Sequence, residues 1–178
     1  LLSRHNYRKV GYFVENDKVR FTDEATTFKV ELVGDLPCDT VFVDNTKAYT
    51  FSGSGAITGH ATLVKTGTGR LNITTDNTYT GGNRLSGGVV SVSSLSNANQ
   101  AHGNLGGVTT KPTDFIMENG AVLQTSAAVQ MGSPIRFEGE EGGSINNSAD
   151  FAMNKAFSGT VLTKSGGGWL KTYATGAN

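Results

Sequence analysis

The stretch TLVKTGTGRLNIT at residues 62–74 decides the fold, because the chain repeats much of it as VLTKSGGGWLKT at residues 161–172. Five positions recur at a constant offset (162 − 63 = 99): Leu63, Lys65, Gly67, Gly69 and Leu71 return as Leu162, Lys164, Gly166, Gly168 and Leu170. A repeated unit of short strand, glycine turn and short strand indicates a stacked β architecture.

Alternation along these strands predicts which side chains form the core. Alternate residues of a strand share a face, so Leu71 and Ile73 point one way while Arg70, Asn72 and Thr74 point the other. The predicted inward set is Leu63, Leu71, Ile73, Leu85, Val90 and Val92. One coil cannot bury such a face alone, whereas stacked coils bury a continuous apolar column.

The rest of the chain reads as strands of three to six residues between glycine turns. Helical periodicity is almost absent, and the best helical segment, residues 92–100, is weak because it is rich in Ser and Asn. We therefore predict an all-β parallel solenoid, with a β-sandwich as the alternative. Residues 1–36 carry longer alternating stretches than the rest of the chain, and Pro37 closes that region, so we predict a domain boundary there. Residues 1–36 are then a cap or the tail of a preceding β domain, and residues 37–178 are a solenoid segment.

Composition narrows the function classes. Fifteen basic and fifteen acidic residues balance, so the charge predicts no nucleic-acid partner. No apolar run is long enough for a membrane helix, and we expect no membrane insertion by this segment. The single cysteine, Cys38, excludes an internal disulfide and is expected to be a small buried hydrophobe.

Residues 62–92 resemble the autotransporter-associated β-strand repeat. The resemblance rests on Leu63, Lys65, Gly67, Gly69, Leu71 and Ile73, then on the string NTYTGG at residues 77–82, then on Leu85, Gly88 and Val90. It implies a right-handed single-stranded parallel β-helix, related to pectate-lyase-like solenoids, in a large bacterial protein that is secreted or held at the cell surface or outer membrane.

The resemblance implies a structural stalk or display scaffold whose partners are flanking domains of the same longer chain. The alternative is a glycan-binding or polysaccharide-degrading β-helix whose active residues lie partly outside this segment. We favour a role without catalysis. Flanking sequence discriminates, since a cluster of catalytic acids indicates an enzyme.

Few residues of the chain are candidates for metal binding or catalysis. His5, His60 and His102 lack the spacing of a metal site, and we predict neither a metal nor a cofactor. No acid pair with a matching base emerges from the available acids, and no catalytic residue is predicted. These acids are Asp76, Asp114, Asp150, Glu138, Glu140 and Glu141.

Trp169 is the one candidate ligand-binding residue. It takes the place of Arg70 in the second copy, so alternation points it outward, opposite Leu170. An outward aromatic ring can stack on a sugar, which makes polysaccharide a candidate partner. The alternative is that the ring packs on a neighbouring segment.

Two further expectations concern the stack itself. Asparagines at stacked turns either bond neighbouring coils in ladders or simply form turns; the candidates are Asn45, Asn77, Asn104, Asn119 and Asn147. The second copy stops before any equivalent of residues 79–82. We therefore expect the C-terminal edge, after about Gly159, to exchange its amide hydrogens fastest or to pair with another molecule.

Overall fold

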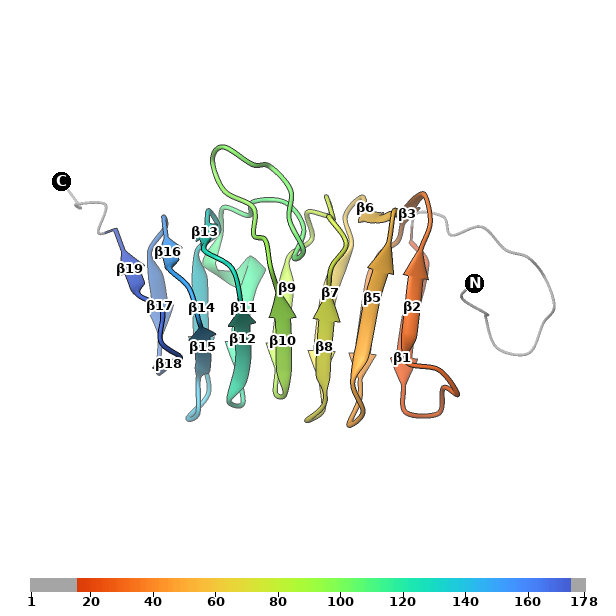
Figure 1. The fold of residues 1–178 in the computed structure, drawn as a ribbon, viewed down its shortest axis with the longest axis horizontal. Helices are drawn as coiled ribbons and strands as arrows, with labels where there is room; N and C mark the ends of the chain where they lie inside the picture. The colour runs from red at the N-terminus through yellow and green to blue at the C-terminus, as the bar shows by residue number, and fades with distance from the viewer. Residues whose placement is uncertain (1–15, 174–178) are drawn as a thin grey trace.

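The computed structural model describes residues 16–173 as a stack of parallel strands with three sides. Within this range there are nineteen strands and one short 3₁₀ helix, η1 (Pro112–Asp114). Figure 1 shows the strands standing side by side along the long axis, from β1 and β2 at one end to β19 at the other. The described residues include no helix with the length and apolarity needed to span a membrane.

Two long sheets form the main walls, and every strand pair in them is parallel. Sheet A contains β1 (Lys18–Thr22), β4 (Thr40–Asp44), β7 (Thr62–Thr66), β9 (Asn83–Ser86), β11 (Phe115–Glu118), β14 (Ile135–Glu138) and β17 (Phe157–Gly159). Sheet B contains β2 (Lys29–Leu32), β5 (Tyr49–Gly53), β8 (Arg70–Ile73), β10 (Val89–Val92), β12 (Ala121–Thr125), β15 (Gly143–Asn147) and β18 (Leu162–Ser165).

The third side is made of two shorter sheets. One pairs β3 (Asp35–Pro37) with β6 (Ala56–Thr58), and the other, sheet C, stacks β13 (Val129–Met131), β16 (Phe151–Met153) and β19 (Leu170–Thr172). Seven coils result, which we number in chain order from β1 to β17, their strands in sheet A. The parallel pairing confirms the predicted solenoid, and the β-sandwich alternative is wrong because it requires antiparallel hairpins.

The core is a set of side-chain columns that run along the stack. In sheet B one column follows the strand register from coil 2 to coil 6 through Tyr49, Leu71, Val90, Leu123 and Ile145, and its last position, in coil 7, is the exposed Lys164. All six residues of the predicted inward set are buried, none more than 3 % exposed. Local alternation was therefore a sufficient guide to the core, because a strand offers its side chains only two faces.

Coil length varies along the stack. Lys18 pairs with Thr40 and Thr40 with Thr62, so coils 1 and 2 each take 22 residues. Coil 4 is longer, because Asn83 pairs with Phe115. Strands on both sides of residue 36 belong to the same stack, and β3 runs across that position. The division of the chain at residue 36 stays a prediction.

The two copies of the repeated stretch lie on different corners of the stack. The first copy turns from sheet A to sheet B, through β7 and β8, whereas the second turns from sheet B to sheet C, through β18 and β19. The two copies therefore form the same kind of corner, but they do not occupy the same position in their coils. A strand–glycine–strand unit encodes a bend, and any corner of a three-sided coil accepts it.

Buried asparagines bridge these corners to the next coil. The amide nitrogen Nδ2 of Asn45 donates to the carbonyl oxygen of Arg70 at 3.0 Å, and Nδ2 of Asn147 donates to that of Trp169 at 3.0 Å. Asn119 instead takes a left-handed turn conformation (φ 53°) and donates to Oγ of Ser86 at 2.7 Å. The asparagines therefore act as individual bridges and turn formers, and they do not stack in one ladder.

Lys65 is the unexpected member of the core. It shares the inward face of β7 with Leu63 and is fully buried. Its ammonium nitrogen Nζ donates to the carbonyl oxygens of Thr66 at 2.5 Å and Gly67 at 3.0 Å, which fastens the corner. Burial lowers the pKa of Lys65 to about 8, and the negative charges of Asp44 and Asp23 offset part of this shift. Lys164 makes the same two bonds at the other corner but is exposed.

The buried ammonium group should make stability depend on alkaline pH. The folded pKa lies below the unfolded value, so between pH 8 and about 10.5 the unfolded chain binds more protons and stability rises with pH. Relative to Lys65→Met, the wild-type free energy of unfolding should increase by about 1–2 kcal/mol from pH 7 to pH 10. The comparison is essential, because Cys38 and Tyr49 have raised pKa values and destabilise the folded state in the same alkaline range.

Denaturant titrations at pH 7, 8, 9 and 10 measure this difference. Lys164→Met removes the same pair of turn bonds at an exposed corner and is the control for loss of the bonds themselves. A difference between wild type and Lys65→Met that stays constant with pH would show that the ammonium group is not desolvated in the folded protein.

Candidate functional site

The largest departure from the regular stack is a long excursion in coil 4, residues 93–111, which we call the arm. It leaves after β10 and returns at η1, where the third side carries no strand in coils 3 and 4 of the described chain. Figure 1 shows it as a green loop that rises beyond the ends of the neighbouring strands. The helix considered for residues 92–100 is absent, because backbone groups of this segment bond across the arm and to Gly132 of coil 5 instead.

Buried asparagines fasten the arm to coil 3. Asn104 Nδ2 donates to the carbonyl oxygen of Thr75 at 2.9 Å, and Asn77 Nδ2 donates to that of Asn104 at 2.8 Å. Asn104 Oδ1 accepts the backbone N–H groups of Ser93 and Ser94 at 2.8 and 2.9 Å. On the other side Asn77 Oδ1 accepts the N–H of Ile57 at 2.9 Å. Asn77 therefore ties coil 2, coil 3 and the arm together.

The remainder of the NTYTGG string closes the same junction. Tyr79 is buried and donates its hydroxyl to Oδ1 of Asn83 at 2.7 Å, while Nδ2 of Asn83 donates to the carbonyl oxygen of Leu105 at 3.0 Å. Gly106 lies so close to Tyr79 that a Cβ atom there would come within 2.5 Å of the tyrosine carbonyl oxygen. The arm is thus packed at its base as tightly as the coils.

The outer part of the arm is a small polar hairpin. Asn97 and Gln100 form an antiparallel bridge, and Oδ1 of Asn97 accepts the N–H of Asn99 at 2.9 Å. An exposed side-chain contact joins the arm to coil 3, with Nδ1 of His102 2.6 Å from Oδ2 of Asp76. The sequence placed His102 and Asp76 apart, since they are 26 positions distant (102 − 76 = 26) and no local pattern links them.

Trp169 lies on the outer side of coil 7, where alternation placed it. Its side chain is 74 % exposed, which confirms the predicted orientation. Its carbonyl oxygen accepts the N–H of Phe151 at 2.8 Å, so the backbone is held while the indole projects outward. Asp150 accepts the N–H of Trp169 at 3.4 Å and a bond from Nζ of Lys171 at 2.6 Å. The bond to Lys171 lowers the pKa of Asp150 and raises that of Lys171.

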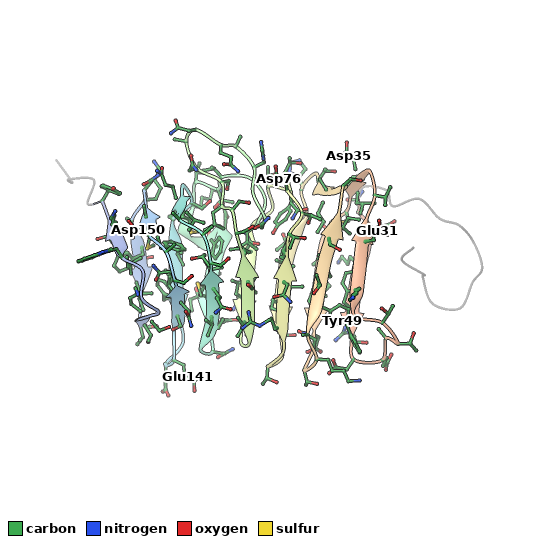
Figure 2. All side chains as sticks on the ribbon, viewed as in Figure 1. Glu31, Asp35, Tyr49, Asp76, Glu141 and Asp150 are labelled. Atoms are coloured by element: carbon green, nitrogen blue, oxygen red, sulfur yellow. The ribbon has the colours of Figure 1, made fainter. Side chains whose placement is uncertain are left out.

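The acidic residues are dispersed along the stack, and those with ion pairs include Glu118, Glu138 and Asp150. Figure 2 shows Glu31, Asp35, Asp76, Glu141 and Asp150 spread along the length of the stack. The closest group is an ion-pair network on sheet A, in which Arg84 lies 2.6 Å from Glu118 and Arg136 lies 3.0 Å from Glu138. Residues 16–173 contain no group of three or more His, Cys, Asp or Glu side chains that could hold a metal ion.

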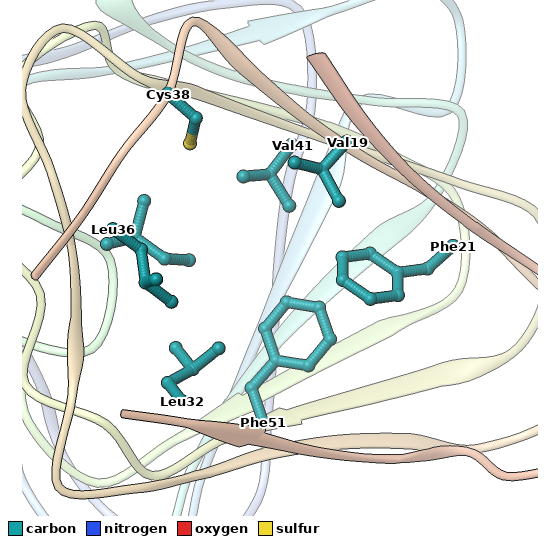
Figure 3. Close-up of a pocket in the computed structure, with 8 residues that line it drawn as sticks. Val19, Phe21, Leu32, Leu36, Cys38, Val41 and Phe51 are labelled. Carbon is teal, nitrogen blue, oxygen red and sulfur yellow. The ribbon is translucent and has the colours of Figure 1, made fainter. Parts of the chain in front are cut away.

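An apolar cavity lies inside coils 1 and 2 (Figure 3). Its lining includes Val19, Phe21, Leu32, Phe51 and Cys38, whose sulfur points into the space. Burial raises the pKa of the Cys38 thiol to about 11, so the reactive thiolate form is suppressed. Cys38 is a free, buried residue, which confirms the expectation of a small hydrophobe in the core.

Comparison with known proteins gives the family context. The passenger-associated-transport-repeat family model matches residues 63–92, which begin in β7 and end with the last residue of β10. The chain is similar to the Adhesin BmaC autotransporter of Brucella suis biovar 1 (strain 1330), at 29 % identity over 142 residues. That match covers 71 % of this chain and 4 % of the relative's length. No solved structure matched the chain.

The matched residues are the ones that build the junction described above. Lys65 fastens the corner, Leu71 and Val90 fill the core column, and Asn77 and Tyr79 join coil 3 to the arm. Residues 63–92 are therefore a repeat of the autotransporter passenger type, set within a parallel β-solenoid.

Proposed function

We propose that this chain is a stiff segment of an exported, cell-surface protein, in which it spaces and displays other parts of the same molecule. The observation that carries the proposal is the unbroken core column from Tyr49 in coil 2 to Ile145 in coil 6. Bending such a stack requires breaking parallel pairs in two sheets at once. The whole stack of seven coils contains six coil-to-coil steps of about 4.8 Å and is therefore about 29 Å long.

The similarities support the setting of this proposal. The passenger repeat and the autotransporter adhesin support export to the cell surface, including attachment at the outer membrane. Because the relative is far longer than this chain, we propose that the segment works beside flanking domains of a longer protein. The division into residues 1–36 and 37–178 belongs to this proposal as well, with coil 1 acting as a cap.

The arm suits a display role because it adds surface without disturbing the stack. Strand register passes from β8 to β10 to β12 on sheet B and from β9 to β11 on sheet A. The arm therefore hangs on otherwise regular coils, and its tip is polar and exposed. Long ordered loops on a rigid scaffold commonly carry contacts with partners.

A degradative enzyme is the weaker reading of the same fold. Hydrolysis of a glycosidic bond requires two carboxyl groups that flank the bond. Here Glu118 and Glu138 are both bonded to arginine, and Asp150 is bonded to Lys171. These contacts favour a role without catalysis for the described part of the chain.

Limited proteolysis tests the stiff, closed stack. Proteinase K should cut first within residues 97–102, where the hairpin of the arm is exposed, and the two fragments should remain associated. Asn104→Ala should accelerate that first cut by about tenfold, because it unties the base of the arm. Asn146→Ala, at a half-buried position on β15 and away from the cut segment, is the matched control and should leave the rate unchanged. Early cuts within sheets A or B would contradict the proposal.

A further inference from the structure

The outer side of sheet C carries an aromatic strip that the stalk role does not use. Strand register pairs Phe151 with Leu170 and Met153 with Thr172, so Trp169 and Tyr173 lie on the opposite, outward face of the chain that contains β19. Their side chains are 74 % and 57 % exposed. Four residues along an extended strand separate their Cα atoms by about 13 Å.

Hydrogen bonds to coil 6 hold the backbone that carries the two rings. The N–H of Tyr173 donates to the carbonyl oxygen of Met153 at 3.2 Å, and the carbonyl oxygen of Trp169 accepts from Phe151 and from Asn147. A ligand that stacks on these rings would therefore order two side chains and not a loop, which keeps the entropic cost of binding low.

The polar groups around the rings favour an uncharged partner. Asp150 lies one coil before Trp169, and its carboxylate is neutralised by Lys171 at 2.6 Å. Asn154 follows Met153 as Tyr173 follows Thr172, and its amide nitrogen Nδ2 donates to Oε1 of Gln130 at 3.3 Å. Each amide group has both a donor and an acceptor, so the amide nitrogen of Gln130 can donate to hydroxyl groups of a ligand and the amide oxygen of Asn154 can accept from them.

We propose that this face, with Trp169 and Tyr173 as stacking platforms and Asp150, Asn154 and Gln130 as polar neighbours, binds an extended, uncharged oligosaccharide. Sugar rings present an apolar C–H face that packs on an aromatic ring and a rim of hydroxyl groups that bond to amides and carboxylates. The spacing of the two rings suits a chain of several linked sugars. This inference rests on the proposed surface display only for its setting, since the strip is a property of coils 5 to 7.

Titration with defined oligosaccharides tests the strip. Trp169 is the sole tryptophan of the chain, so its fluorescence reports this face directly. Chitohexaose or cellohexaose should change the emission saturably and bind at least about tenfold more tightly than the corresponding disaccharide, because the longer chain reaches both rings. Added salt should leave the affinity unchanged, because no net charge is involved.

Variants separate the strip from other surfaces. Trp169→Ala should abolish calorimetric binding, and Tyr173→Ala should weaken it by about tenfold, by analogy with stacking of nucleic-acid bases on aromatic side chains. Phe42→Ala, at an exposed aromatic on sheet A, is the matched control and should bind as wild type. Thermal melts confirm that each variant is folded.

Any of the following outcomes overturns the proposal: no saturable change with either hexaose, equal affinity for hexaose and disaccharide, or full binding by Tyr173→Ala. Binding of heparin that is tighter than that of both neutral sugars and is lost in salt also overturns it, in favour of an electrostatic contact. None of these results bears on the proteolysis pattern, so failure of the strip and failure of the stalk are distinguishable.

Discussion

Leu71→Ala should lower the free energy of unfolding by about 2–5 kcal/mol. Leu71 is fully buried in β8 and lies in the column of sheet B between Tyr49 and Val90. Removing its branched end leaves a cavity that its neighbours cannot fill, because backbone hydrogen bonds hold the coils at a fixed spacing. Urea denaturation followed by circular dichroism measures the change.

Val89→Ala provides the matched control for this prediction. Val89 is the residue next to Val90 on β10, pairs with Arg70, and faces outward with partial exposure. Its truncation should cost less than about 1 kcal/mol, since little buried volume is lost. Equal losses for Leu71→Ala and Val89→Ala would mean that the inward and outward faces are wrongly assigned.

Gly82→Ala should destabilise the protein by about 2–4 kcal/mol through the backbone. Gly82 has a φ of 91°, a backbone conformation that residues other than glycine rarely adopt. A Cβ atom added there would lie 2.0 Å from the carbonyl oxygen of Asp114 in the next coil. Both the strained dihedral and the clash must be relieved, and relief requires coils 4 and 5 to separate locally. Thermal and urea unfolding both report this loss.

Gly87→Ala separates the two causes. Gly87 has nearly the same φ, 92°, but the nearest atom to a Cβ added there would be the carbonyl oxygen of Gly67 at 3.4 Å. Its substitution should cost about 1–2 kcal/mol, the penalty for the left-handed conformation alone. If Gly82→Ala costs no more than Gly87→Ala, close packing between coils does not explain the glycine pair at residues 81 and 82.

Local patterns were enough to predict the class of fold and the faces of its strands. Alternation assigned Leu71 and Ile73 to the core and Trp169 to the surface because it depends only on the geometry of an extended chain. The repeated glycine turns indicated stacked coils from the chain itself, whereas the NTYTGG string did so only through its resemblance to the autotransporter-associated β-strand repeat. The exposed position of the candidate site residue was therefore predictable, whereas its ligand stays a prediction.

Tertiary structure alone decided how the coils fit together. The second copy of the repeat turns a different corner because its sequence specifies a bend and not a side of the stack. Lys65 can lie in the core because its ammonium group donates hydrogen bonds to the carbonyl oxygens of its own turn. These hydrogen bonds exist only once the corner has formed. The contacts of Asn77 with Asn104 and of Asp76 with His102 join residues more than 25 positions apart. These contacts depend on which coils lie next to each other, and no local period in the sequence specifies such pairs of residues.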